Sequence, residues 1–159
     1  MGEDSNTPLY SKDGKEFNKN VIKKSYDLQN TFDGYKICSK KIQEFYLNNR
    51  FKGVNFIKIE DGSKEYFILD VHNILNVNRK KTKLTFENIY PIGDSVTFQG
   101  NLYLNYSMVT DGFYRTDISF GCGEMMQPLI IVPERVWLKM KSLKLKGVDY
   151  EQVFFEDDI

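Results

Sequence analysis

Apolar residues along this chain follow two different spacings. Near residues 40–50 and 134–144 they recur every third or fourth position, at Ile42, Phe45, Tyr46, Val136, Met140 and Leu143. This spacing places them on one face of a helix. From about 54 to 120, short apolar runs separated by Gly, Asn and Asp predict strands and turns instead. The pattern therefore predicts an α+β fold with a mostly antiparallel sheet and two principal helices.

The two helical segments belong to units that repeat with a spacing of 94 residues. The stretch from Ile37 to Ile59 aligns without a gap on the stretch from Ile131 to Val153. Apolar and basic positions recur, whereas no polar residue of catalytic character does, so the repeat indicates a duplicated packing unit. We predict two strand–helix–strand units, at about 35–60 and 129–155, flanking a strand-rich middle. A chance likeness between two amphipathic helices followed by Lys-Gly is the alternative explanation.

One glycine stands at the same point of each unit. Glycine adopts the left-handed conformation without steric cost, and a left-handed residue commonly ends a helix. Gly53 and Gly147 are therefore predicted to end the two helices and to be structurally required. Ser39 is placed to cap the first helix, and Pro133 takes that place in the second. The last strand of the second unit is predicted to contain Val148, Tyr150 and Val153.

Length and composition indicate one globular domain over residues 1–159. The 22 basic residues balance 22 acidic ones, so charge favours neither nucleic acid nor an anionic membrane as a direct partner. No apolar stretch approaches the roughly 18 residues of a membrane span, and the polar, acidic amino terminus is not a secretory signal. Two cysteines do not make a disulfide framework. We therefore expect a cytoplasmic protein whose polar amino-terminal arm, residues 1–30, is loosely held.

The residues that usually supply catalysis are scarce. His72 is the single histidine, so a His-based metal site or a Ser-His-Asp triad lacks material. Asp70 and His72 would face the same side of a strand, which makes an acid–base pair one enzymatic alternative. The other enzymatic alternative uses Cys122, which lies between two glycines. Cys38 aligns with Val132 in the repeat and is predicted to be a core residue. We expect no enzyme activity and no cofactor.

Four runs of residues, in this order, resemble a protein family. They are Lys52-Gly53-Val54-Asn55-Phe56, the run from Tyr66 to Val77, Ile130-Ile131-Val132-Pro133-Glu134-Arg135-Val136 and Leu145-Lys146-Gly147-Val148-Asp149-Tyr150. The chain resembles, over residues 35–155, the small intracellular immunity proteins of bacterial polymorphic toxin systems, in the group of immunity families eleven and forty-three. It departs from them at Pro133, where they have serine, and at Asn78–Lys81, where they are acidic. The resemblance implies a protein that binds a cognate toxin domain and neutralises it by stoichiometric inhibition, with no catalytic residue.

The carboxy-terminal end is the expected partner surface. Binding energy concentrates in a few aromatic and charged residues, and complementary charge sets the encounter rate. The residues of these kinds are Tyr150, Glu151, Phe154, Phe155, Glu156, Asp157 and Asp158, together with Asp61 and Asp111 at predicted hairpin tips. The alternative is that Phe154 or Phe155 completes a core strand while the acids only solvate the end. Another cytoplasmic interaction or adaptor domain, of phage or regulatory type, would also use such a surface.

Overall fold

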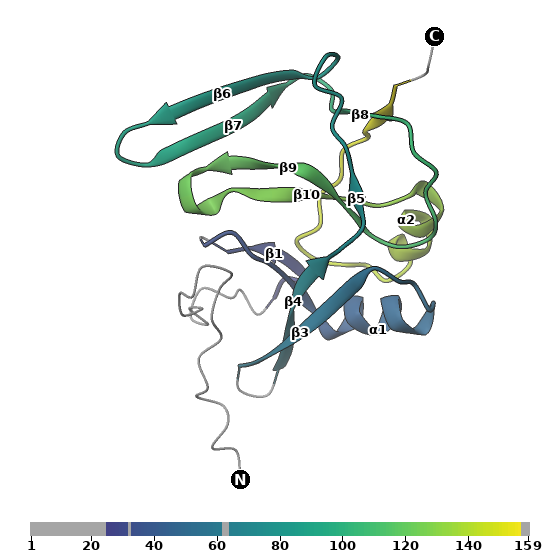
Figure 1. Cartoon of the computed structure of the whole chain (residues 1–159). Helices are drawn as coiled ribbons and strands as arrows, with labels where there is room; N and C mark the ends of the chain where they lie inside the picture. Colours follow the sequence, from purple (N-terminus) through teal and green to yellow (C-terminus); the bar gives the residue numbers. More distant parts are fainter. Residues whose placement is uncertain (1–24, 32, 62–63, 157–159) are drawn as a thin grey trace.

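The computed structural model describes residues 25–31, 33–61 and 64–156 (Figure 1). In these ranges it contains two α-helices and three sheets, and most strand pairs are antiparallel. The predicted α+β class is therefore confirmed. Most of the amino-terminal arm predicted at residues 1–30 lies outside the described residues.

The first sheet has four strands in the order β1-β2-β4-β3. Their bounds are β1 Leu28–Asn30, β2 Lys36–Ser39, β3 Val54–Asp61 and β4 Lys64–Val71. β3 and β4 pair along their whole length, which confirms the hairpin predicted at Asp61 and Gly62. Along the central strand β4, alternate side chains enter two separate clusters of buried residues, one on each face. Its middle, Tyr66–Leu69, is a continuous apolar run because both faces are covered there.

Helices α1 (Lys40–Asn48) and α2 (Glu134–Lys141) pack against the same cluster of buried residues. We call this cluster the first core; its members include Ile42, Phe45 and Tyr46 of α1, Val136 and Met140 of α2, and Phe67, Leu69 and Val71 of β4. Leu143 packs against it from just beyond α2. The apolar spacing seen in the sequence is thus the buried stripe of each helix.

The two helices begin at equivalent positions of the repeat, and α2 is one residue shorter than α1. Ser39 and Pro133 are their N-caps. After each helix the first residue in the left-handed region is not glycine, since Arg50 has φ 57° and Lys144 has φ 51°. Both pairs keep the spacing of 94 residues. The repeat is therefore present in the backbone from the cap to the turn that follows the helix.

The glycines of the repeat lie further along the chain than predicted. Both helices stop several residues earlier, so the prediction that Gly53 and Gly147 end them is wrong. Both glycines are nevertheless left-handed, with φ 89° and 74°. A Cβ on Gly53 would lie 1.9 Å from Nδ2 of Asn73, and one on Gly147 would lie 2.7 Å from Cγ of Tyr26. Close approach to a neighbouring residue, together with the left-handed backbone, is what requires glycine there.

The two units differ after the glycine. In the first, β3 follows at once and pairs with β4. In the second, residues 148–153 are irregular and the strand β11 holds only Phe154–Phe155, so the strand predicted through Val148 and Tyr150 is largely absent. The physical reason is the availability of a strand to pair with. β4 follows β3 and pairs with it as a hairpin, whereas the described part of the chain has no equivalent strand after the second unit.

The second sheet runs in the order β10-β9-β7-β6, with β5 paired to β9. Its bounds are β5 Ile74–Leu75, β6 Lys83–Ile89, β7 Gly93–Gln99, β9 Tyr114–Cys122 and β10 Gln127–Ile131. β7 meets β9 only at Ser95 with Cys122 and Val96 with Gly121. The β6–β7 hairpin therefore projects from the body of the molecule (Figure 1).

A two-stranded parallel sheet joins β8 (Tyr103–Leu104) to β11. Because β8 pairs with β11 and β9 pairs elsewhere, the turn at Asp111 and Gly112 does not close a hairpin, and the predicted hairpin tip at Asp111 is wrong. Leu104 is fully buried in a second core that also contains Leu75, Val77, Tyr114, Ile118 and Phe120. Phe155 packs against this second core.

Candidate functional site

The carboxy-terminal strand presents aromatic rings that are held by other rings. The ring of Phe154 lies 5.8 Å from that of Tyr103, and the ring of Phe155 lies 6.0 Å from that of Tyr106. Phe155 is half-buried against the second core, whereas Phe154 stands at the surface and Tyr106 is 67% exposed. Phe155 therefore completes the core, as one of the two sequence alternatives allowed, and Phe154 remains outside it.

A third ring pair joins α2 to the segment that follows it. The rings of Trp137 and Tyr150 are 4.7 Å apart, with an interplanar angle of 46°. Trp137 packs against the first core, while Tyr150 is 65% exposed, and Leu138 is also exposed. The irregular segment after α2 is thus fixed to the helix by an aromatic contact, which holds the Tyr150 ring in one place.

The connection between β8 and β9 links the two ring pairs of β11 to the ring pair of α2. Its Met108 is 87% exposed. Arg135, at the start of α2, forms an ion pair with Asp111 and donates a hydrogen bond of 3.1 Å to the carbonyl oxygen of Val109. β8, this connection and α2 follow one side of the molecule (Figure 1). We call the exposed large side chains of these segments and of the carboxy-terminal end the carboxy-terminal surface; they are Tyr106, Met108, Leu138, Tyr150 and Phe154.

Two of the acidic residues predicted for partner binding are engaged within the chain. The Glu156 carboxylate accepts a hydrogen bond from the side-chain amide of Asn78. The Asp111 carboxylate is paired with Arg135. Glu151 is exposed. Asp157 and Asp158 lie outside the described residues, as does the side chain of Asp61.

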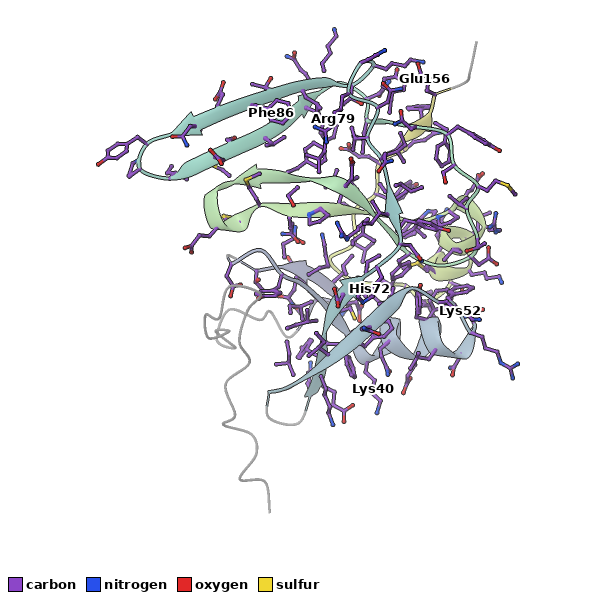
Figure 2. The ribbon with its side chains drawn as sticks, in the orientation of Figure 1. Lys40, Lys52, His72, Arg79, Phe86 and Glu156 are labelled. Atoms are coloured by element: carbon purple, nitrogen blue, oxygen red, sulfur yellow. The ribbon has the colours of Figure 1, made fainter. Side chains whose placement is uncertain are left out.

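A basic turn adjoins the carboxy-terminal end. Asn78, which holds Glu156, also accepts hydrogen bonds from the backbone N–H groups of Lys80 (3.1 Å) and Lys81 (2.9 Å). Lys81 places its ammonium 4.6 Å from the centre of the Tyr103 ring. Figure 2 shows Arg79 and Glu156 in the same upper region of the molecule. The acidic carboxy-terminal end therefore lies beside cations, and the surface carries charges of both signs.

His72 and Asp70 meet as their spacing in the strand predicts. Nε2 of His72 lies 3.1 Å from Oδ2 of Asp70 and 3.0 Å from Nδ2 of Asn55. One ring nitrogen can either donate to the carboxylate or accept from the amide, so the tautomer decides which contact is a hydrogen bond. The imidazole is exposed (Figure 2). Among the described residues, this exposed pair is the arrangement closest to that of a general acid–base site.

The two cysteines have different surroundings. Cys38 is fully buried in the first core, which confirms the predicted core position, and burial raises the pKa of its thiol. Cys122 is half-buried at the start of a short 3₁₀ turn, Gly123–Met125. Within the described ranges, no three His, Cys, Asp or Glu residues are grouped so as to hold a metal ion.

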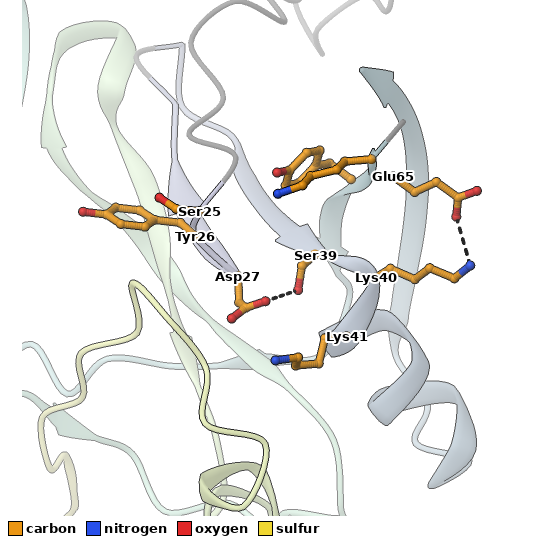
Figure 3. Close-up of a pocket in the computed structure, with 9 residues that line it drawn as sticks. Ser25, Tyr26, Asp27, Ser39, Lys40, Lys41 and Glu65 are labelled. Carbon is orange, nitrogen blue, oxygen red and sulfur yellow. Dashed lines mark hydrogen bonds and ion pairs between the residues drawn. The ribbon is translucent and has the colours of Figure 1, made fainter. Parts of the chain in front are cut away.

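A cavity of about 370 Å³ lies beside the start of α1, lined in part by Lys40, Lys41 and Lys64 (Figure 3). Its polar groups largely serve contacts within the chain. The Ser39 hydroxyl donates to Asp27 at 2.7 Å instead of capping the helix, and Lys40 pairs with Glu65 at 3.6 Å. Lys40 and Lys58 lower the pKa of the Glu65 carboxyl.

Asp27 joins the two units of the repeat. One carboxylate oxygen accepts from Ser39 of the first unit, and the other accepts from the backbone N–H of Lys146 of the second at 2.8 Å. The cavity at this junction is therefore best explained as part of the packing between the units. Sequence reasoning missed this role because Asp27 lies outside both aligned stretches.

Three members of the carboxy-terminal surface were also missed by the sequence analysis. Tyr106, Met108 and Leu138 are exposed, and their spacing along the chain gives no sign of it. Comparisons of the chain with protein-family models, with curated proteins and with solved structures give no match. In the part of the chain that the structure describes, no helix has the length and apolar character needed to cross a membrane.

Proposed function

We propose that this chain is an immunity protein: a cytoplasmic protein that binds a cognate toxin domain, encoded beside its own gene, and neutralises it by forming a stoichiometric complex. The sequence resemblance supports this role, and the carboxy-terminal surface is the observation that carries it. Tyr and Trp side chains dominate binding energy at protein interfaces. Tyr106 and Tyr150 are exposed here, yet each is held by a neighbouring ring. Side chains that are already ordered lose less entropy when they bind.

The charges around these rings would select the partner. Glu151 is exposed next to Tyr150, and Lys139 and Lys141 are exposed on α2. Opposite charges on the partner would speed the encounter, and like charges would exclude competing proteins. Replacing Glu151 by Lys should therefore slow association at low ionic strength, with an effect that shrinks as salt screens the charge.

The test is binding of the purified chain to the toxin domain encoded next to its gene, by calorimetry, together with protection of cells that express the toxin. We expect one copy of the chain per toxin domain and abolished toxicity. Tyr150→Ala should weaken binding by about ten- to a hundredfold, as hot-spot tyrosines do. Tyr90→Ala is the matched control, because Tyr90 is 93% exposed but lies at the turn of the β6–β7 hairpin.

The possible outcomes test the immunity role and the use of the carboxy-terminal surface independently of each other. If the chain neither binds nor protects against the neighbouring toxin, the immunity role is refuted. If Tyr150→Ala binds normally while Tyr90→Ala does not, the role stands and the carboxy-terminal surface is excluded. A complex with a non-toxin partner would favour the adaptor alternative.

An enzyme is the second candidate, favoured by the 3.1 Å contact between His72 and Asp70. The variant His72→Ala distinguishes it from a binder. A protein that protects by binding alone needs no general base, so the folded variant should retain full protection. A variant that still binds the toxin but no longer protects would instead support catalysis.

A further inference from the structure

The β6 strand leaves one edge of the second sheet open. In the described part of the chain β6 pairs with β7 alone, and of its seven residues every one except the half-buried Leu84 is exposed. It contains no proline, whereas the opposite edge strand, β10, contains Pro128. An edge without proline presents unpaired N–H and C=O groups to any further strand.

Phe86 makes this edge apolar on the side that faces the core. It lies opposite Val96 in the hairpin, and Leu84 lies opposite Phe98. Leu84, Val96 and Phe98 all pack in or against the second core. Phe86 continues the same face yet is 60% exposed (Figure 2). A ring at this position would be covered by an apolar side chain on a strand added beside β6.

The sequence of β6 is complementary to itself in one antiparallel register. The backbone groups that point away from β7 belong to alternate residues, so two β6 strands can pair only in registers centred on a residue. When the centre is Thr85, Lys83 of each copy faces Glu87 of the other, and Leu84 faces Phe86. Opposite charges and apolar residues placed across from one another stabilise such pairs.

The neighbouring register is much less favourable. A centre at Phe86 would place Lys83 opposite Ile89 and Leu84 opposite Asn88. This register would leave each charge without an opposite charge and each apolar side chain, apart from Phe86 itself, opposite a polar or charged one. In a two-fold interface both copies use the same surface patch, so the patch must be complementary to itself. The register centred on Thr85 meets this requirement.

We propose that a second copy of this chain docks on β6, with the two strands antiparallel about a two-fold axis at Thr85, so that the second sheets of both copies become continuous. The formal net charge of the chain is +0, so charge does not oppose association. The dimer is independent of the immunity role and leaves the carboxy-terminal surface to another partner.

The test is sedimentation of the full chain over a range of concentrations. The wild type should form a reversible dimer. Lys83→Glu places acid opposite acid at both ends of the interface, and Glu87→Lys places base opposite base, so each should weaken the dimer about tenfold. The double variant Lys83→Glu/Glu87→Lys should restore wild-type affinity. A mixture of the two single variants should form a heterodimer more tightly than either variant dimerises alone.

The controls exclude effects of the substitutions on the hairpin itself or on folding. Lys83 faces Gln99 and Glu87 faces Ser95 within the hairpin, so neither substitution removes a charge partner across the hairpin. Lys52→Glu, an exposed lysine at the other end of the molecule (Figure 2), should leave the dimer unchanged. Thermal melts would confirm that each variant is folded. A wild type that remains monomeric up to about 1 mM overturns the proposal. A dimer that both single variants leave intact, or that the double variant fails to restore, overturns it as well.

Discussion

Replacing Gly53 by alanine tests how the turn after α1 is joined to the start of β9. A Cβ at this position would lie 1.9 Å from Nδ2 of Asn73 and 2.4 Å from its Cγ. Nδ2 of Asn73 donates to the carbonyl oxygens of Lys52 and Phe113, each at 3.2 Å. Because the new methyl group occupies the place of this amide, Gly53→Ala must displace Asn73 and break both hydrogen bonds.

The expected cost follows from three contributions. A left-handed backbone costs an L-residue about 1–2 kcal/mol, and Gly53 has φ 89°. Losing two hydrogen bonds costs about 1 kcal/mol each. The smaller conformational freedom of alanine in the unfolded chain offsets about 0.5–1 kcal/mol. The sum is a loss of about 2–3.5 kcal/mol in the free energy of unfolding, or a fall in Tm of about 4–14 °C for a chain of this size.

The measurement is urea unfolding followed by circular dichroism, with two controls. Gly100 has φ 76° and no atom within 4 Å of an added Cβ, so Gly100→Ala reports the backbone cost alone, about 1 kcal/mol. In an Asn73→Ala background, Gly53→Ala should cost no more than Gly100→Ala does. If Gly53→Ala and Gly100→Ala were equally destabilising in the otherwise unchanged protein, the role assigned to Asn73 would be wrong.

Two further predictions concern buried titrating groups. Burial lowers the pKa of Lys36 from 10.5 to about 8, so between these pH values the unfolded chain binds the proton and the folded protein does not. The free energy of unfolding should therefore rise with pH across this window. Lys36→Met should be more stable than the wild type at pH 7, by about 1–3 kcal/mol, and its free energy of unfolding should rise less with pH. Equal slopes of unfolding free energy against pH in both proteins would contradict this. Burial raises the pKa of the Cys38 thiol, so a disulfide reagent should modify Cys122 in the native protein and both thiols only after unfolding. Rapid modification of both native thiols would show that Cys38 is accessible.

Elements that depend on local sequence could be predicted well. The helices follow from apolar residues at helical spacing, such as Ile42 and Val136, because that spacing alone places them on one face. The β3–β4 hairpin could be predicted because the sequence Asp61-Gly62, a common turn signal, stands between two apolar runs. The ends of the helices could not be predicted, because Arg50 and Lys144 adopt a strained conformation that sequence rules assign to glycine.

The candidate surface was predicted in part. Tyr150 and Phe154 are exposed as expected of anchor residues. Which carboxylates remain available to a partner was harder to predict, because the sequence does not show whether an acidic side chain is paired within the fold. Glu156 is held by Asn78, 78 positions earlier, and Asp111 pairs with Arg135, 24 positions later. Nothing in the linear pattern marks either partner.

The chain's own residues decide which segments become helix or strand and which of their faces are apolar, because these properties depend on side chains a few positions apart. Strand pairing is different, because it depends on which edges remain free once both cores are packed. β8 could have paired with β9, the next strand along the chain, yet it pairs with β11, with 51 positions between Tyr103 and its partner Phe154. Leu104 and Phe155 enter the same core there, and burying both stabilises a contact that local sequence does not specify.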